Sequence, residues 1–215
     1  MCGRFTQVLS WPELRDLMEL EGPMLDLAPR YNVAPGQQIA AVRREPDGRR
    51  LAMLRWGLIP GWAADPAIGH RLINARAETA SSKPSFRGAF RSRRCLIPAS
   101  GFYEWQRAGA VRQPYLIGRG DGRLLAFAGL WERWTVRRGA TLGGSLAAHE
   151  PGDVIETCTI LTTSANEAVA PVHHRMPVIL PREAFEPWLG GEHLPLGPWA
   201  AGMPAGGPGG APLHN

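Results

Sequence analysis

The apolar residues of this chain fall in short runs separated by turn residues, and the runs do not alternate regularly with long helical segments. Two runs, 39–42 and 51–56, flank the turn residues Pro46, Asp47 and Gly48 and predict a β-hairpin. Further strands are predicted at 95–98, 115–117, 124–130, 155–163 and 178–180. Because a doubly wound parallel sheet requires strands that alternate with helices, the pattern favours an α+β, strand-rich fold with a curled, mostly antiparallel, barrel-like sheet core.

Several short helices accompany these strands. Residues 10–20 have a helical period, with Ser10 as the expected N-cap, Pro12 in the first turn and Glu13 as the acid of a capping box. Further short helices are predicted at 74–79, 84–91, 165–170 and 182–189.

The length and composition suit one globular domain. A chain of 215 residues with 44% hydrophobic and 20% charged residues can bury a core without disulfides. Residues 135–153 are polar and rich in glycine, which predicts a surface insertion. Residues 190–215 are dense in Gly, Pro and Ala, so we expect a working domain of residues 1–189 followed by a flexible tail of residues 190–215.

The cellular setting is inferred from the amino terminus and the cysteines. Polar Thr6 and Gln7 interrupt any signal-peptide core, and no run approaches the ~18 apolar residues of a membrane helix. The cysteines Cys2, Cys95 and Cys158 are too few and too scattered for a disulfide framework, and none forms a C-x-x-C pair. We therefore expect a cytoplasmic monomer in a reducing compartment, with no metal, no cofactor and no membrane partner.

The positive charge comes almost wholly from arginine. The net charge is +5, and Lys83 is the only lysine among 24 basic residues. Guanidinium groups match phosphate in a bidentate way, which favours a phosphate-rich partner, although a GC-rich genome produces the same bias. Aromatic residues interleaved with arginines suit the stacking of unpaired bases, whereas Trp56, within a strand, is the expected core member. The rings are Phe5, Trp56, Trp62, Phe86 and Trp105, and the arginines are Arg4, Arg76, Arg87 and Arg175.

Cys2 is the most informative candidate for chemistry. Removal of Met1 would leave a 1,2-aminothiol, a free α-amine beside a thiol. An α-amine has a pKa near ~7.7–8.0 against ~10.4 for lysine, so much of it is unprotonated at neutral pH. Such an amine forms an imine with an aldehyde, and the thiol can then close a five-membered thiazolidine ring. A cysteine at position two is usually incidental when it stands alone.

Three other residues could assist this chemistry. Glu104 lies between two aromatic residues, where burial would raise its pKa toward neutrality, or it is simply exposed at a strand end. His173 could move a proton or be merely solvated. Asn74 could bind a substrate oxygen or act only as a helix N-cap. Arg76 and Arg175, near Asn74 and His173 in the sequence, could hold phosphates.

These segments together resemble the SOS response-associated peptidase family, whose members process abasic sites and cross-link to single-stranded DNA. The resemblance extends over several independent motifs in order along the chain. They are Met1-Cys2-Gly3-Arg4-Phe5, Tyr31-Asn32-Val33-Ala34-Pro35, Trp56-Gly57-Leu58-Ile59-Pro60-Gly61-Trp62, Asn74-Ala75-Arg76-Ala77-Glu78-Thr79, Arg94-Cys95-Leu96-Ile97-Pro98, Gly101-Phe102-Tyr103-Glu104-Trp105, Phe127-Ala128-Gly129-Leu130-Trp131-Glu132 and His173-His174-Arg175-Met176-Pro177.

The resemblance implies a mechanism for a cross-linking enzyme of the DNA damage response. Cys2, once Met1 is gone, would link through a thiazolidine to the aldehyde of a ring-opened abasic deoxyribose, assisted by Asn74, Glu104 and His173. His173 is chosen over its neighbour because the family pattern is His-x-Arg-Met-Pro. The implied partner is single-stranded DNA that contains abasic sites, which would bring the protein to the nucleoid. The implied DNA contacts are Arg4, Pro35, Trp62, Arg76, Trp105 and Arg175.

Three other functions stay open at this point. A glutamine amidotransferase also uses an N-terminal cysteine, although its glutamine-binding motifs are not found in this chain. An N-terminal-cysteine peptidase that releases Cys2 autocatalytically is the second alternative. A non-catalytic single-strand-binding protein, with an incidental Cys2, is the third, and it would bind intact and abasic strands equally.

Overall fold

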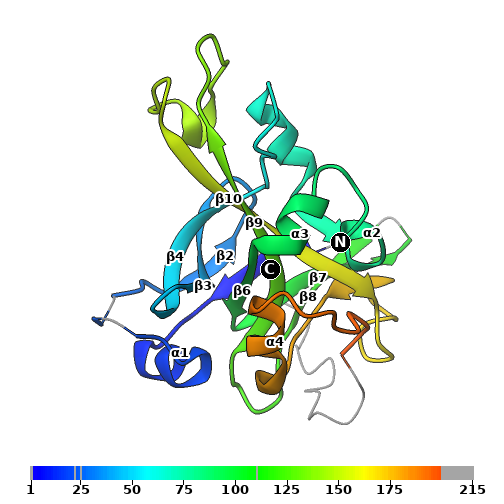
Figure 1. Cartoon of the computed structure of the whole chain (residues 1–215). Helices are drawn as coiled ribbons and strands as arrows, with labels where there is room; N and C mark the ends of the chain where they lie inside the picture. The colour runs from blue at the N-terminus through cyan, green and yellow to red at the C-terminus, as the bar shows by residue number, and fades with distance from the viewer. Residues whose placement is uncertain (1, 22, 25, 110, 200–215) are drawn as a thin grey trace.

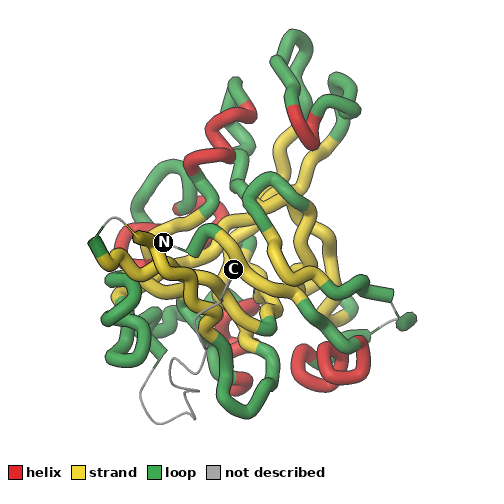
Figure 2. The backbone as a smooth tube through the Cα atoms, turned by 180° about the vertical axis from the view of Figure 1, so that it is seen from behind, coloured by secondary structure: helices red, strands yellow, loops and turns green. Residues whose placement is uncertain are grey.

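The strands form two sheets, with the helices at the periphery (Figures 1 and 2). This computed structural model describes residues 2–21, 23–24, 26–109 and 111–199. The strands are β1 (Arg4–Gln7), β2 (Arg30–Val33), β3 (Gln38–Glu45), β4 (Gly48–Trp56), β5 (Asn74–Arg76), β6 (Arg94–Ala99), β7 (Gly101–Ala108), β8 (Val111–Ile117), β9 (Leu125–Thr135), β10 (Val154–Ser164) and β11 (Arg175–Pro177). The helices are α1 (Trp11–Met18), α2 (Ala77–Ala80), α3 (Arg87–Ser92) and α4 (Phe185–Leu189), with 3-10 turns η1 (Pro66–Arg71), η2 (Gly144–Leu146) and η3 (Arg182–Ala184).

Five strands of the larger sheet close into a barrel in the order β10-β4-β3-β6-β9. The β9–β10 pairing brings the last strand back to the first, and β10 also carries β5 and β11 on its second half. Among the described pairings between named strands, only β10–β4 and β10–β5 are parallel. The predicted strand-rich, curled, mostly antiparallel core is therefore confirmed, as is the hairpin of β3 and β4.

The barrel strands bury both faces, which explains why their apolar runs are nearly continuous. On β3, Ile39 and Ala41 belong to one core cluster, while Ala40 and Val42 belong to another. The first cluster includes the T-shaped ring pair of Phe5 and Trp56. The second packs against α1, α3 and α4. Since side chains alternate across a strand, a two-sided core requires apolar residues at successive positions.

The smaller sheet has the order β2-β1-β7-β8, and it is joined to the barrel through Gln7. The buried amide of Gln7 donates to the carbonyls of Ala40 (2.9 Å) and Pro98 (3.0 Å) and accepts from Ala40 N–H (3.1 Å). It fills the place where β3 and β6, paired only at Val42 with Leu96 and Arg43 with Cys95, diverge. The Gln7 side chain thus supplies hydrogen bonds to Ala40 and Pro98 where β3 and β6 do not pair with each other.

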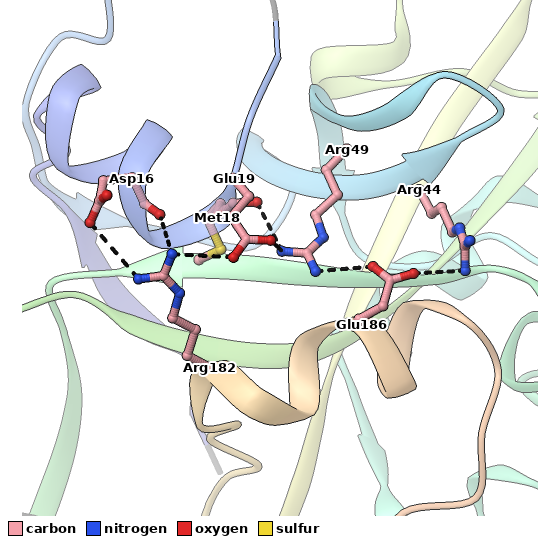
Figure 3. A network of polar contacts seen from close by, with 7 residues as sticks. All are labelled: Asp16, Met18, Glu19, Arg44, Arg49, Arg182 and Glu186. Atoms are coloured by element: carbon pink, nitrogen blue, oxygen red, sulfur yellow. Dashed lines mark hydrogen bonds and ion pairs between the residues drawn. The ribbon is translucent and has the colours of Figure 1, made fainter.

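A network of ion pairs ties the helices to the hairpin (Figure 3). Arg49 on β4 contacts Glu19 after α1 and Glu186 on α4, each at 3.0 Å. Glu186 also pairs with Arg44 at 2.8 Å, and Glu19 pairs with Arg182 at 3.2 Å. These contacts hold α1, α4 and the hairpin against one another.

Several local predictions are corrected by the structure. Residues 74–76 form β5 rather than a helix, because they pair with β10, and α2 begins only at Ala77. Residues 165–170 form turns, and 178–180 form only a single bridge from Ile179 to Phe127. No capping box forms: Ser10 makes no side-chain cap, and the Glu13 carboxylate accepts from Leu124 N–H at 3.3 Å.

The predicted insertion and tail both pack more than their composition suggests. Val136 and Leu146 of the insertion pack with Trp134 in a third, small core cluster. Leu194 and Leu196 pack against the helix-covered cluster, although they fall within the segment predicted to be flexible. Residues 200–215 lie outside the described part of the chain. No helix among the described residues is long and apolar enough to cross a membrane.

Replacing Gln7 with leucine should lower the free energy of unfolding by about 2–4 kcal/mol, because three buried backbone groups would lose their partner. The measurement is urea unfolding at a constant m-value. Gln113→Leu on β8 is the matched control, since the Gln113 amide only donates to the adjacent Pro114 carbonyl (3.3 Å), and its change should stay within about 0.5 kcal/mol. Equal stability of Gln7→Leu and the parent protein would contradict the joining role.

Candidate active site

Cys2 is held at the junction of the two sheets. It lies two residues before the start of β1, the strand that runs between β2 and β7, and its side chain is fully buried. Asn74 Nδ2 donates to the Cys2 carbonyl oxygen at 2.8 Å, and the Cys2 thiol donates to the Arg4 carbonyl at 3.8 Å. Cys2 is therefore held at its carbonyl by the Asn74 amide and at its thiol by the Arg4 carbonyl.

Asn74 comes from β5, whose parallel register with β10 sets Asn74 opposite Ile160. Its Oδ1 is buried and accepts no hydrogen bond from any described residue. A buried acceptor without a partner costs free energy unless a ligand or water supplies a donor. The side chain thus anchors Cys2 with one atom and leaves the other available.

Glu104 and His173 form the second half of the site. Glu104 lies on β7, only 2% exposed, and its Oε1 is 3.9 Å from His173 Nδ1. Burial raises the pKa of Glu104 above the ordinary carboxyl value, opposed by the nearby His174 imidazole. A carboxyl group with a raised pKa can both give and accept a proton closer to neutral pH.

His173 is oriented by its own chain. His173 Nδ1 lies 3.0 Å from the Arg175 backbone nitrogen and 3.1 Å from the Arg175 carbonyl oxygen, so the backbone of Arg175 fixes the ring. Burial lowers the pKa of His173, so the neutral form is favoured. The ring stacks on that of His174 with centroids 4.4 Å apart.

The thiol of Cys2 is not a ready thiolate. Burial, and then the negative charge of Glu104, raise its pKa well above the ordinary thiol value. Burial also raises the pKa of the thiols of Cys95 and Cys158, which lie in the core. A reaction of the Cys2 thiol therefore needs a base to take the thiol proton. Glu104 is the carboxyl group whose charge influences this thiol.

The residues expected to contact DNA differ in their exposure and in their contacts with the rest of the chain. Trp62 is 57% exposed and Trp105 is 36% exposed. Arg76 is exposed, and its guanidinium group has no hydrogen bond or ion pair with the part of the chain that the structure describes. Arg4 donates to Asn32 Oδ1 at 2.8 Å, and half-buried Pro35 lies between β2 and β3.

Arg175 forms an ion pair with Glu78, a residue that the sequence pattern did not single out. Its guanidinium binds both Glu78 carboxylate oxygens, at 2.6 and 2.9 Å, and donates to the Thr162 carbonyl at 2.6 Å. The side chain is only 11% exposed. A phosphate would have to compete with Glu78 for Arg175. Glu78 lies four residues after Asn74, where the matched block begins, but its partner is far away in the sequence.

A further aromatic surface was also missed. Tyr31 is 66% exposed, and its carbonyl accepts a hydrogen bond from the Tyr103 hydroxyl at 2.9 Å. The Tyr103 and Trp105 rings lie 6.4 Å apart. Tyr31 stands in a matched motif beside Asn32, which was the only available signal. Among the described residues, no group of His, Cys, Asp and Glu side chains is arranged to hold a metal ion.

Known proteins share both the sequence and the fold of this chain. The relative named abasic site processing protein YoaM, from Bacillus subtilis, is 43% identical over 192 residues, which cover 88% of this chain and 79% of the relative. The abasic site processing protein YedK of Escherichia coli is 32% identical over 195 residues, with the same two coverages. A crystal structure of a Bordetella bronchiseptica protein has a TM-score of 0.72 at 27% identity and covers 89% of both chains.

The family comparison covers nearly all of the described chain. Residues 1–196 match the model of the SOS response associated peptidase (SRAP) family. The match includes β1 with Cys2, β5 with Asn74, β7 with Glu104 and the segment that carries His173. The chain therefore belongs to the SOS response associated peptidase family.

Proposed function

We propose that this chain processes abasic sites in single-stranded DNA by forming a thiazolidine cross-link through Cys2 after Met1 has been removed. The observation that carries the proposal is the setting of Cys2, whose carbonyl is held by Asn74 and whose thiol lies within the influence of the buried Glu104. The names of the relatives, abasic site processing proteins, support the same substrate. The chemistry requires an aldehyde, which a ring-opened abasic deoxyribose supplies.

The first step is attack of the Cys2 α-amine on the aldehyde carbon. The carbon–nitrogen bond forms as the carbonyl electron pair moves to oxygen, and loss of water then gives an imine. Glu104, with its raised pKa, can give a proton to the departing hydroxyl. The unpartnered Asn74 Oδ1 can accept a hydrogen bond from a hydroxyl of the opened sugar.

The second step is ring closure by the thiol. The carbon–sulfur bond forms at the imine carbon, while the carbon–nitrogen π pair moves to nitrogen and takes a proton. The Glu104 carboxylate can accept the thiol proton and pass it to that nitrogen, so the step is neutral overall. His173, neutral and 3.9 Å from Glu104, can support the carboxyl group during this exchange.

The surface around the site suits an unpaired strand. Exposed Trp62 and Trp105 offer faces for stacking, and Arg4 and Arg76 offer guanidinium groups to phosphates. Single-stranded DNA fits better than a duplex, because a duplex leaves no base free to stack on these rings.

Replacing Cys2 with alanine, in protein lacking Met1, should abolish the stable adduct but preserve binding. An imine formed by the remaining amine has no thiol to close the ring and hydrolyses. Abasic single-stranded DNA is incubated with each protein, followed by denaturing electrophoresis and intact mass of the adduct. A heat-stable cross-link of undiminished yield in Cys2→Ala would contradict the proposal, and so would the absence of any adduct with the parent protein.

Replacing Glu104 with glutamine should change the pH profile of cross-linking. In the reactive state the Glu104 carboxyl is protonated and the α-amine is not. The two groups together therefore carry one titratable proton. The parent rate should therefore rise with pH through the raised pKa of Glu104 and fall above the amine pKa of about 8. Glu104→Gln leaves only the amine to titrate, so its rate should rise toward about pH 8 without a decline, and it should be ~10²–10⁴ lower at neutral pH.

The controls for Glu104→Gln are its melting temperature and its affinity for undamaged single-stranded DNA, both expected to stay close to the parent values. If the variant has the same bell-shaped profile as the parent, Glu104 does not take part in proton transfer.

Replacing Glu78 with glutamine should strengthen DNA binding by releasing Arg175. The hydrogen bonds from Arg175 hold the pKa of Glu78 below its usual range, so this carboxylate is charged at neutral pH and competes with phosphate. Affinity should rise, and the salt dependence should steepen by ~0.7 for one added phosphate contact. Glu183→Gln, an exposed site on η3 with the same charge change, is the control. Equal effects of the two variants would contradict the competition.

A further inference from the structure

A groove of about 850 Å³ carries an excess of arginine. Its walls are the loop 60–62, the segment 81–94 that includes α3, and single residues from β9 and the C-terminal segment. Among its lining residues are four arginines, Arg87, Arg91, Arg93 and Arg94, against one acid, Glu132.

Two of these arginines have structural roles. Arg94 is buried, donates to the Phe90 carbonyl at 2.7 Å and stacks over the Trp188 ring at 4.4 Å. Arg93 pairs with Glu132 at 2.7 Å, which satisfies the one carboxylate of the groove.

The other two are unused by the fold. Arg87 and Arg91 are exposed, and neither guanidinium group has an ion pair or hydrogen bond with any residue in the described part of the chain. They lie four residues apart on α3, a spacing that puts both on one face of a helix. Their charges are therefore directed at whatever enters the groove.

Trp62 adds a flat apolar wall to this charged groove. Its ring is 57% exposed, so an aromatic face is open to a partner. Its loop is held firmly, because Arg137 donates to the Trp62 carbonyl at 3.2 Å and Ala63 N–H donates to the Pro60 carbonyl at 2.8 Å. A fixed, exposed ring among guanidinium groups is the combination that binds a strand of unpaired bases.

The groove is continuous in sequence with the candidate site. Arg76 ends β5, α2 begins at the next residue, and Ser81 already lines the groove. Only the four residues of α2 separate Arg76 from Ser81. A strand held at Cys2 and Arg76 therefore has a cationic path onward past α2.

We infer that this groove binds the single-stranded DNA flanking the lesion, with Arg87 and Arg91 on phosphates and Trp62 against a base. This rests on the proposed function and deepens it, since it gives the protein a second contact region, formed by loop 60–62 and α3, that does not need the abasic site.

The first experiment measures binding of an undamaged single strand, which involves no cross-linking chemistry. Arg87→Gln/Arg91→Gln is compared with Arg15→Gln/Arg123→Gln, a control with the same charge change at exposed residues outside the groove. The slope of log affinity against log salt should become shallower by ~1.4 in the groove variant, at ~0.7 per phosphate, and stay near the parent value in the control. Equal slopes in the two double variants would overturn the inference.

Trp62→Ala tests the ring separately. It should weaken binding of the undamaged strand about fivefold or more, while Trp62→Phe should retain most of the affinity, because stacking needs only an aromatic face. If either the arginine or the tryptophan variants weaken binding of a duplex more than of a single strand, the assignment to unpaired DNA is wrong.

The second experiment uses abasic oligonucleotides with a long flank on the 5′ side only, on the 3′ side only, or on neither. One flank should speed cross-linking by the parent protein at low DNA concentration, and Arg87→Gln/Arg91→Gln should remove that gain without slowing the oligonucleotide that has no flank. No adduct with any substrate, together with intact groove binding, would refute the proposed function alone. Normal cross-linking with identical flank effects in parent and variant would refute the groove alone.

Discussion

The change of partners along β10 is the constraint on which both the barrel and the candidate site depend. Its first half pairs in parallel with β4 and closes the barrel, and the chain then leaves this edge at Gly57, whose N–H still donates to the Cys158 carbonyl at 2.8 Å. From Ile160 onward β5 occupies the same edge. The backbone can leave this edge only because residues 57 and 69 are both glycine. Gly57 has φ 128°, and a Cβ on either residue would lie 2.8 Å from the carbonyl oxygen of the other residue. Asn74 reaches Cys2 because β4 has vacated this position.

The site concentrates polar groups that a stable core would normally avoid. A carboxyl group that is 2% exposed, a buried amide oxygen without a described partner and a fully buried thiol all lie where the two sheets meet. Each is unfavourable for folding, since buried polar groups give up their hydration. The two-sided core of the barrel and the Gln7 junction hold these groups in place from outside. Strain and desolvation of this kind gather at functional sites because the same burial changes the pKa values that chemistry uses.

The sequence predicted what local patterns encode and missed what distant pairing decides. The β3–β4 hairpin and the burial of Trp56 followed from apolar runs and turn residues, and both are confirmed. Asn74 could not be placed on a strand, because β5 has only three residues and exists through its pairing with β10, far along the chain. The Glu78–Arg175 pair joins residues 97 apart, beyond any periodicity. The set Cys2, Asn74, Glu104 and His173 came from the family resemblance; the structure brings Cys2 to Asn74 and Glu104 to His173, and the roles of all four stay predictions.

In the proposed function, the residues that would attract DNA are not the residues that would transfer protons. Around Cys2 the groups favour neutral forms: burial disfavours the thiolate, the ionised Glu104 and the protonated His173. A nucleophile in such surroundings works better as an uncharged amine than as a thiolate, so in the proposed cross-linking reaction the carbon–nitrogen bond would form first and the thiol would act only on the imine. The positive charge lies outside this region, on exposed Arg76 and on the arginines of α3. In the proposed function, long-range attraction of a phosphate chain and short-range proton transfer would use different residues, so a change in one need not disturb the other.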